Sequence, residues 1–264
     1  MKFNFFKYQG VGNDFVIVDN REMGIHFTEK QINYLCDRRF GIGADGLMLL
    51  EKHNKLDFSM KYYNSDGKES SMCGNGGRCL VQFAKRLNII DKEAKFMAID
   101  GEHKAVVKKD TVSLQMVDVN QISKVNSNYF VNTGSPHYVL FREDIDKIDV
   151  YHRGSEIRYS AEFGPDGTNV NFVEIRNDKI YVRTYERGVE NETLSCGTGV
   201  TASAICASVY SKSDKNSYDI ITKGGNLNVS FKKAGQNKFT AIWLTGPATF
   251  VFEGAIEIKL NEFF

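Results

Sequence analysis

The sequence has little proline, a single tryptophan and almost no net charge. Of its 264 residues only 3 are proline, and 42% are hydrophobic. This composition favours a packed globular protein over a disordered or proline-rich chain. The formal net charge of +1 argues against a large nucleic-acid footprint or an acidic partner surface. We therefore expect no nucleic acid among its partners.

The sequence also lacks a long apolar run and a paired cysteine motif. No stretch approaches the roughly 18 apolar residues that a membrane helix needs. Residues 1–10 carry Asn4, Lys7 and Gln9 and lack the apolar core of a signal peptide. Five cysteines form an odd count without a CxxC pair, which favours free thiols in a reducing compartment. We expect a cytoplasmic protein with no membrane partner.

Two glycine-rich cysteine loops repeat one another. Cys73-Gly74-Asn75-Gly76 and Cys196-Gly197-Thr198-Gly199 lie 123 residues apart, each before a helix-like run. Further pairs at nearly this spacing are Phe40-Gly41 with Phe163-Gly164, Tyr62 with Tyr185, Glu69 with Glu192, Gly101 with Gly224, and residues 12–15 with 134–137. A repeat of this length predicts two homologous domains of ordinary size. We expect an N-terminal domain at 1–117, to which the tail 250–264 returns, and a C-terminal domain at 118–249.

The local patterns predict an α+β fold. In the first half we expect strands within 3–19, at 47–51, 58–63 and 95–117, and helices at 28–38 and from Cys73 to about Leu87. The second half repeats the plan, with strands at 138–141, 170–175 and 179–185 and a helix at 198–210 that is apolar on every side and therefore buried. Each domain should be a curved, mostly antiparallel sheet or barrel wrapped around its central helix, with the active site in the cleft between the domains.

Residues 41–46 match the dinucleotide fingerprint GxGxxG in letters alone. The fingerprint requires a strand before the loop and a helix after it. Here a predicted helix precedes the loop and a predicted strand follows it. We interpret the segment as a turn without a nucleotide.

The cysteine loops have the chemistry of an acid–base site. Glycines at a helix start let a ligand approach the backbone, and the unpaired N–H groups and the helix dipole attract an anion. The same position lowers a thiol pKa from about 8.5. Two such thiols on opposite sides of an α-carbon suit the inversion of an amino acid, in which one thiolate removes the proton and one thiol returns it.

Other interpretations of these residues stay open. Cys36, Cys79 and Cys206 are expected to be small buried hydrophobes. The cysteine spacings do not match structural zinc sites, so we expect no metal. A third alternative is a cysteine–histidine nucleophile that uses His137.

The full set of motifs resembles the diaminopimelate epimerase family, pyridoxal-independent isomerases of the lysine and cell-wall branch. The matching pieces, in order along nearly the whole chain, are residues 12–15, 40–46, 63–67, 72–76, Pro136-His137, Asn169 before Phe172, 186–188 and 196–199. The resemblance implies no cofactor, a homodimer, and diaminopimelate as the substrate, with interconversion of its LL and meso forms.

The resemblance also implies roles at matching positions. Cys73 and Cys196 are similar to the paired acid and base, with His137 and Glu186 beside them to tune the thiols and position the reacting amino group. Asn13, Asn64, Asn169 and Arg187 are similar to ligands of the distal end of the substrate, and Gly74, Asn75, Gly197 and Thr198 to the cradle of the reacting carboxylate. Ser135 and Gly46 depart from residues that many or some members carry, so we assign neither to the substrate.

Each of these residues also has a structural explanation. The three asparagines adjoin turns, where this residue is favoured. Glu186 and Arg187 are compatible with a solvated ion pair, and Asn75 and Thr198 with helix caps.

Two rival functions remain at this level. The first is a proline racemase or hydroxyproline epimerase, whose members carry Cys-Gly-His-Gly in the first loop, where this chain has Asn75, and lack the Glu-Arg-Gly element. The second is a non-catalytic amino-acid-binding module, against which the retention of both cysteines argues. Related isomerases of phenazine-type biosynthesis share the fold but lack the cysteine pair.

Overall fold

The computed structural model describes residues 1–70 and 72–258 and divides the chain into two compact units. Unit 1 comprises Met1–Leu114 and the C-terminal segment from Pro247 on, and unit 2 comprises Gln115–Gly246. Of the tail that the sequence assigns to the first domain, residues 259–264 lie outside the described part, as does residue 71. Within the described ranges no helix combines the length and apolarity that a bilayer crossing requires.

Unit 1 is a sheet that winds around one helix. Its elements are β1 (Lys2–Gly10), β2 (Asn13–Asp19), α1 (Glu29–Cys36), β3 (Gly46–Glu51), β4 (Phe58–Asn64), α2 (Gly74–Arg86), β5 (Glu93–Ala98), β6 (Gly101–Lys108), β7 (Thr111–Gln115) and β17 (Thr249–Glu257). The strands follow the order β17-β1-β2-β3-β4-β5-β6-β7. The pairs β2–β3 and β4–β5 are parallel and the others antiparallel.

Unit 2 contains β8 (Ile122–Val125), β9 (Asn128–Asn132), β10 (Pro136–Phe141), α3 (Val150–Arg158), β11 (Asn169–Arg176), β12 (Lys179–Glu186), β13 (Asn191–Thr193), α4 (Gly197–Tyr210), β14 (Ser217–Thr222), β15 (Gly225–Gly235) and β16 (Lys238–Pro247), with short 3₁₀ turns at Ile145–Lys147 and Ala161–Phe163. The strand order is β8-β9-β10-β11-β12-β14-β15-β16, and β13 also pairs with β12. The parallel pairs are β10–β11 and β12–β14.

The two units share one topology. The parallel pairs fall at the same places in both strand orders, and each is bridged by a helix: α1 and α2 in unit 1, α3 and α4 in unit 2. The α+β class expected from the sequence is confirmed, and this shared order is what a duplicated domain would give. The sequence patterns had not indicated α3, whose nine residues include Gly154 and few apolar side chains.

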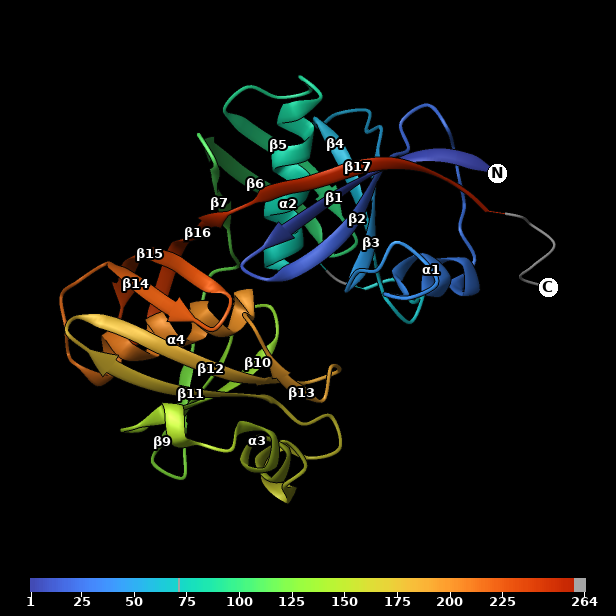
Figure 1. Ribbon diagram of the computed structural model, residues 1–264. Helices are drawn as coiled ribbons and strands as arrows, with labels where there is room; N and C mark the ends of the chain where they lie inside the picture. Colours follow the sequence, from blue (N-terminus) through green and yellow to red (C-terminus); the bar gives the residue numbers. More distant parts are fainter. Residues whose placement is uncertain (71, 259–264) are drawn as a thin grey trace. The chain divides into compact units, whose positions relative to one another are not determined.

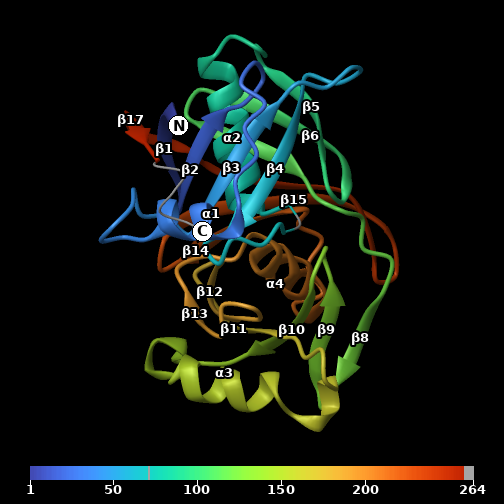
Figure 2. The same ribbon diagram turned by 90° about the vertical axis from the view of Figure 1, so that its right-hand side faces the viewer.

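The central helices lie inside their sheets. In unit 1, α2 packs against β1, β2, β3, β6 and β17 (Figure 1). In unit 2, α4 packs against strands from β9 to β15, and Figure 2 shows it almost end-on within them. Nearly every residue of α4 is buried, which confirms the helix expected from its Ala, Ser, Val and Ile content.

A second helix covers the other face of each sheet. In unit 1, Ile32 and Leu35 of α1 pack with Val16 and Val18 of β2, which is buried on both faces. The helix begins where the sequence predicts, because Thr28 and Gln31 form a reciprocal capping box. The two helical layers fix the ends of β2, β3 and β4 close to the start of α2.

Candidate active site

Each predicted thiol stands at the start of a central helix. Cys73 and Cys196 are the N-cap residues of α2 and α4, and neither side chain makes a capping hydrogen bond. The sulfur atoms are therefore available for other contacts, beside N–H groups that attract an anion. Asn75 and Thr198 are the second residues of their helices, so the alternative that they act as caps is wrong.

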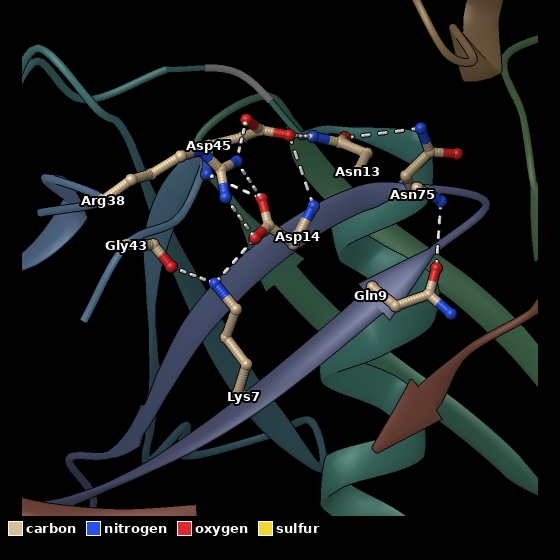
Figure 3. A network of polar contacts seen from close by, with 9 residues as sticks. Lys7, Gln9, Asn13, Asp14, Arg38, Gly43, Asp45 and Asn75 are labelled. Atoms are coloured by element: carbon tan, nitrogen blue, oxygen red, sulfur yellow. Dashed lines mark hydrogen bonds and ion pairs between the residues drawn. The ribbon is translucent and has the colours of Figure 1, made fainter. Parts of the chain in front are cut away.

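In unit 1 the carboxamide of Asn13 connects the thiol to its surroundings. Its Nδ2 donates to Asp45 Oδ2 at 2.6 Å, while its Oδ1 accepts from Cys73 Sγ at 3.6 Å and from Asn75 Nδ2 at 3.3 Å. Figure 3 shows Asn13 between Asp45 and Asn75. Because a carboxylate can only accept, Asp45 fixes the direction of this amide and turns Oδ1 toward the sulfur.

A tight hairpin and an ion network hold Asn13 in place. The two-residue turn Val11–Gly12 between β1 and β2 has φ of 48° and 87°, the left-handed values of a type I′ turn, and Asn13 follows it directly. The neighbouring Asp14 receives Lys7 at 2.7 Å and both Nη groups of Arg38 (Figure 3). Although burial opposes ionisation, these cations lower the pKa of Asp14 to about 2.

Arg78 is a site residue that the sequence analysis missed. It is fully buried, and its guanidinium donates to Gly74 O at 3.0 Å and to Asn75 Oδ1 at 2.9 Å. It thereby fixes the first turn of α2 and aims the Asn75 amide at Asn13. The sequence places Arg78 five residues after Cys73, but this spacing alone reveals neither its burial nor its hydrogen bonds.

Asn64 and Gly46 lie opposite each other at the edge of the unit 1 sheet. Asn64 is exposed, and its backbone closes a turn through Lys68 O and Gly67 N. A Cβ at Gly46 would lie 2.5 Å from Tyr63 O, so this strand position has no room for a side chain. This crowding explains why position 46 of this chain carries glycine.

In unit 2 a chain of hydrogen bonds leads from β10 to the thiol. Cys196 Sγ lies 3.5 Å from Thr198 Oγ1, which lies 2.9 Å from His137 Nε2. The other imidazole nitrogen faces Asn171 Nδ2 at 3.0 Å. His137 is therefore one hydroxyl away from the sulfur and is fully buried. We assign it a positioning role rather than contact with substrate.

The surroundings keep His137 neutral. Burial first, and then the charge of Arg187, lower its pKa to about 3. An imidazole with this pKa carries no charge at physiological pH. The lowered pKa favours the neutral imidazole and argues against an imidazolium partner of the thiol.

Asn169 and Arg187 lie together at the ends of β11 and β12. Asn169 Nδ2 donates to Ser135 Oγ at 2.9 Å and Pro136 O at 2.8 Å, while its Oδ1 accepts from Arg187 N at 2.9 Å. Both amide hydrogens of Asn169 are thus used inside the protein. The Arg187 guanidinium donates to Asp166 O at 3.4 Å, and within residues 1–70 and 72–258 no carboxylate forms an ion pair with it.

Glu186 ends β12, directly before Arg187. Its carboxylate accepts from Thr193 Oγ1 at 2.9 Å, across the β12–β13 pair. A half-buried arginine without a carboxylate partner is suited to an anionic ligand.

The remaining cysteines are structural. Burial raises the pKa of Cys36 and Cys79 to about 12 and raises that of Cys206 further. All five cysteines are thiols, and these three are buried, as expected. Among the described residues no group of three or more His, Cys, Asp and Glu side chains is arranged to hold a metal ion.

Solved structures share this fold. A phenazine biosynthesis protein of the PhzF family from Bacillus anthracis superimposes with a TM-score of 0.79 at 14% identity, covering 98% of this chain and 100% of that one. A hydroxyproline epimerase from Agrobacterium vitis gives a TM-score of 0.70 at 15% identity, with 97% and 92% covered. At these identities the likeness concerns the fold alone.

Curated relatives identify the family. The model of the family described as diaminopimelate epimerase matches residues 5–122 and 129–251. The diaminopimelate epimerase of Flavobacterium psychrophilum is 52% identical over 95% of this chain and 99% of its own length. That of Chlorobaculum tepidum is 42% identical over 94% and 99%. The chain belongs to the diaminopimelate epimerase family.

Proposed function

We propose that this protein is an isomerase that interconverts LL- and meso-2,6-diaminopimelate by inverting one α-carbon. The reaction would supply precursors of lysine and peptidoglycan. The observation that carries the proposal is the placement of Cys73 and Cys196 as N-caps of the two central helices. The names of the full-length relatives supply the substrate.

The proposed chemistry uses the thiols as a two-base pair and needs no cofactor. One thiolate removes the α-proton on one face, and the other thiol donates a proton to the opposite face, so the mechanism requires the two sulfurs to address one carbon. N–H groups of Gly74, Asn75, Gly197 and Thr198 are proposed to hold the reacting carboxylate. The oriented N–H dipoles then stabilise the negative charge that develops on this carboxylate in the transition state.

The distal end of the substrate is assigned to a smaller set of side chains. Arg187 is proposed to bind the second carboxylate, because the residue is half-buried and no carboxylate within the described ranges forms an ion pair with its guanidinium. Asn64, at the exposed strand end, is proposed to complete the contacts with the distal end. Glu186 is proposed to tune the thiols and to help position the reacting amino group. Asn13 and Asn169 are proposed to act mainly by orienting Cys73 and Arg187, since their amides are engaged within the protein.

A substrate comparison tests the proposal. The protein is incubated with LL-diaminopimelate, L-proline and 4-hydroxyproline in deuterated water, and α-deuteration is followed for each. We expect label in diaminopimelate only. Labelling of proline or hydroxyproline instead would favour the rival racemase, and labelling of none would favour a non-catalytic binding module.

The resemblance also supports a homodimer in the cytoplasm. Sedimentation of the purified protein and fractionation of the source cells would check these two inferences.

A further inference from the structure

Hydrogen bonds have a direction, and in unit 2 this direction is fixed far from the thiol. Asn171, which is fully buried, uses Nδ2 toward Tyr138 O at 3.3 Å, and its Oδ1 accepts from Thr184 Oγ1 at 2.9 Å. A backbone carbonyl can only accept, so the nitrogen of this amide is on the Tyr138 side. The same Nδ2 faces His137 Nδ1 and must donate to it.

The amide therefore selects one tautomer of His137. With Nδ1 as an acceptor, the single proton of the neutral imidazole resides on Nε2. That N–H donates to Thr198 Oγ1 at 2.9 Å. The hydroxyl of Thr198, which accepts this bond, keeps its own proton available to donate to its other neighbour, Cys196 Sγ at 3.5 Å.

The packing leaves little freedom for this arrangement. A Cβ at Gly199 would lie 2.5 Å from Asn171 Oδ1 and 3.4 Å from Cys196 Sγ, so the amide and the sulfur both lie against this glycine. Thr133 Oγ1 additionally donates to Thr198 O at 2.8 Å and holds the residue from its backbone side.

We propose that Asn171 is a positioning residue which, through His137 and the Thr198 hydroxyl, makes Cys196 the thiolate, and hence the base, of the resting protein. This inference rests on the proposed function. A hydrogen bond donated to an ionised sulfur favours the ionised form. No proton has to move along the chain, because the tautomer only sets which way the Thr198 hydroxyl points.

The partner of Cys73 is oriented the other way. There Asp45 fixes the Asn13 amide so that its oxygen faces the sulfur, which acts as the donor at 3.6 Å. An acceptor beside a thiol favours the protonated form, which suits Cys73 as the acid. The positive charge of Arg78 acts in the opposite direction, because a cation favours the thiolate form of Cys73. The Nη groups of Arg78 donate to Gly74 O and Asn75 Oδ1.

Unit 2 also has charged residues at the end of β12. Glu186 ends β12 and Arg187 follows it, and the charge of Arg187 acts on His137. Since β12 packs against α4, both charges stay in every variant used below.

The tautomer can be tested in the intact protein without substrate. Nitrogen NMR of histidine-labelled protein, with His137→Gln to assign the signal, should show His137 protonated on Nε2 at neutral pH. Protonation on Nδ1 would overturn the inference whatever the activity of the enzyme.

The thiols are then titrated by their ultraviolet thiolate absorbance, with Cys73→Ala and Cys196→Ala proteins to separate the two steps. Cys196 should ionise at lower pH than Cys73. Thr198→Val should raise the Cys196 midpoint by about one pH unit, the expected effect of one hydrogen bond to a charged group, and Thr198→Ser should restore it. A lower midpoint for Cys73, or an unmoved midpoint in Thr198→Val, would contradict the proposal.

The role of Asn171 has a matched control. Asn171→Leu removes the donor to His137, so the Nδ1-protonated form should appear and the Cys196 midpoint should rise. Thr184→Val removes the hydrogen bond to Asn171 Oδ1 but leaves Nδ2 in place. The His137 tautomer and the Cys196 titration midpoint should therefore both stay near wild type. Equal shifts in the two variants would show a purely structural effect. If Asn171→Leu does not fold, the tautomer and Thr198 measurements still decide.

Discussion

His137 Nε2 lies 2.9 Å from the hydroxyl oxygen of Thr198, and the imidazole is fully buried. The folded protein holds this histidine neutral, with a pKa lowered to about 3, whereas an unfolded histidine titrates near 6.5. Between these values the unfolded chain binds the extra proton. Stability contributed by His137 is therefore present above about pH 6.5 and is lost as the pH falls.

Urea unfolding at pH 7 and pH 5 measures this effect. We expect the wild-type protein to lose more stability on acidification than His137→Gln, because the variant cannot take up the proton on unfolding. Other titrating groups contribute to both proteins and cancel in the comparison. An equal loss in the two proteins would mean that His137 is already charged in the folded state.

The ion network around Asp14 predicts a stability effect in unit 1. Lys7 is buried beside Asp14, so Asp14→Ala leaves an uncompensated cation and should cost about 3–5 kcal/mol. The double variant Lys7→Met with Asp14→Ala should regain part of this loss. Chemical denaturation of the three proteins measures the coupling, and simple additivity would contradict it.

Because this network lowers the pKa of Asp14 to about 2, its stabilisation is present above about pH 4 and is lost as the pH falls toward 2. Wild-type protein should therefore show a steeper acid loss of stability in this window than Asp14→Asn. Parallel pH profiles would argue against an ionised Asp14 in the folded protein.

Arg187 should determine recognition of the distal carboxylate. Arg187→Ala should weaken transition-state binding of diaminopimelate by about 2–5 kcal/mol, seen mainly as a higher KM. Among the described residues the guanidinium makes one long hydrogen bond, to Asp166 O, so the melting temperature should change little. Arg187→Lys keeps the positive charge but lacks the planar guanidinium, so its KM should lie between those of the wild type and Arg187→Ala. If Arg187→Ala showed wild-type kinetics, the assignment of Arg187 to the distal carboxylate would be wrong.

Gly199 provides a steric test of the second thiol. A methyl group there would meet Asn171 Oδ1 at 2.5 Å and lie 3.3–3.4 Å from the Cys196 side chain. Gly199→Ala should therefore displace the thiol and reduce kcat strongly. In Gly77→Ala the nearest atom is the flexible Met72 Sδ at 3.1 Å, so this variant serves as the milder control. Similar kcat values for both variants would count against a precise placement of Cys196.

The sequence predicted the two central helices and the cysteine loops at their starts, because glycine loops before apolar helices are local signals. It did not predict that the cysteines themselves are the N-caps. Helix α3 was missed because its amphipathic pattern is weak and its packing on Tyr185 arises only in the folded unit. Arg78 and Asn171 were missed for a related reason. Their importance follows from the direction of hydrogen bonds to groups distant in the sequence, which no spacing reveals. The expected roles of Asn13 and Asn169 stay predictions, now with an orienting function.

The central claim is that two thiols act on opposite faces of one α-carbon. Epimerisation of LL-diaminopimelate in deuterated water, sampled early, tests it most directly. The account predicts solvent deuterium in the inverted product, unlabelled recovered substrate, and no inversion by Cys73→Ala or Cys196→Ala. Inversion at a near wild-type rate by either variant, or product that retains its original proton, would contradict it.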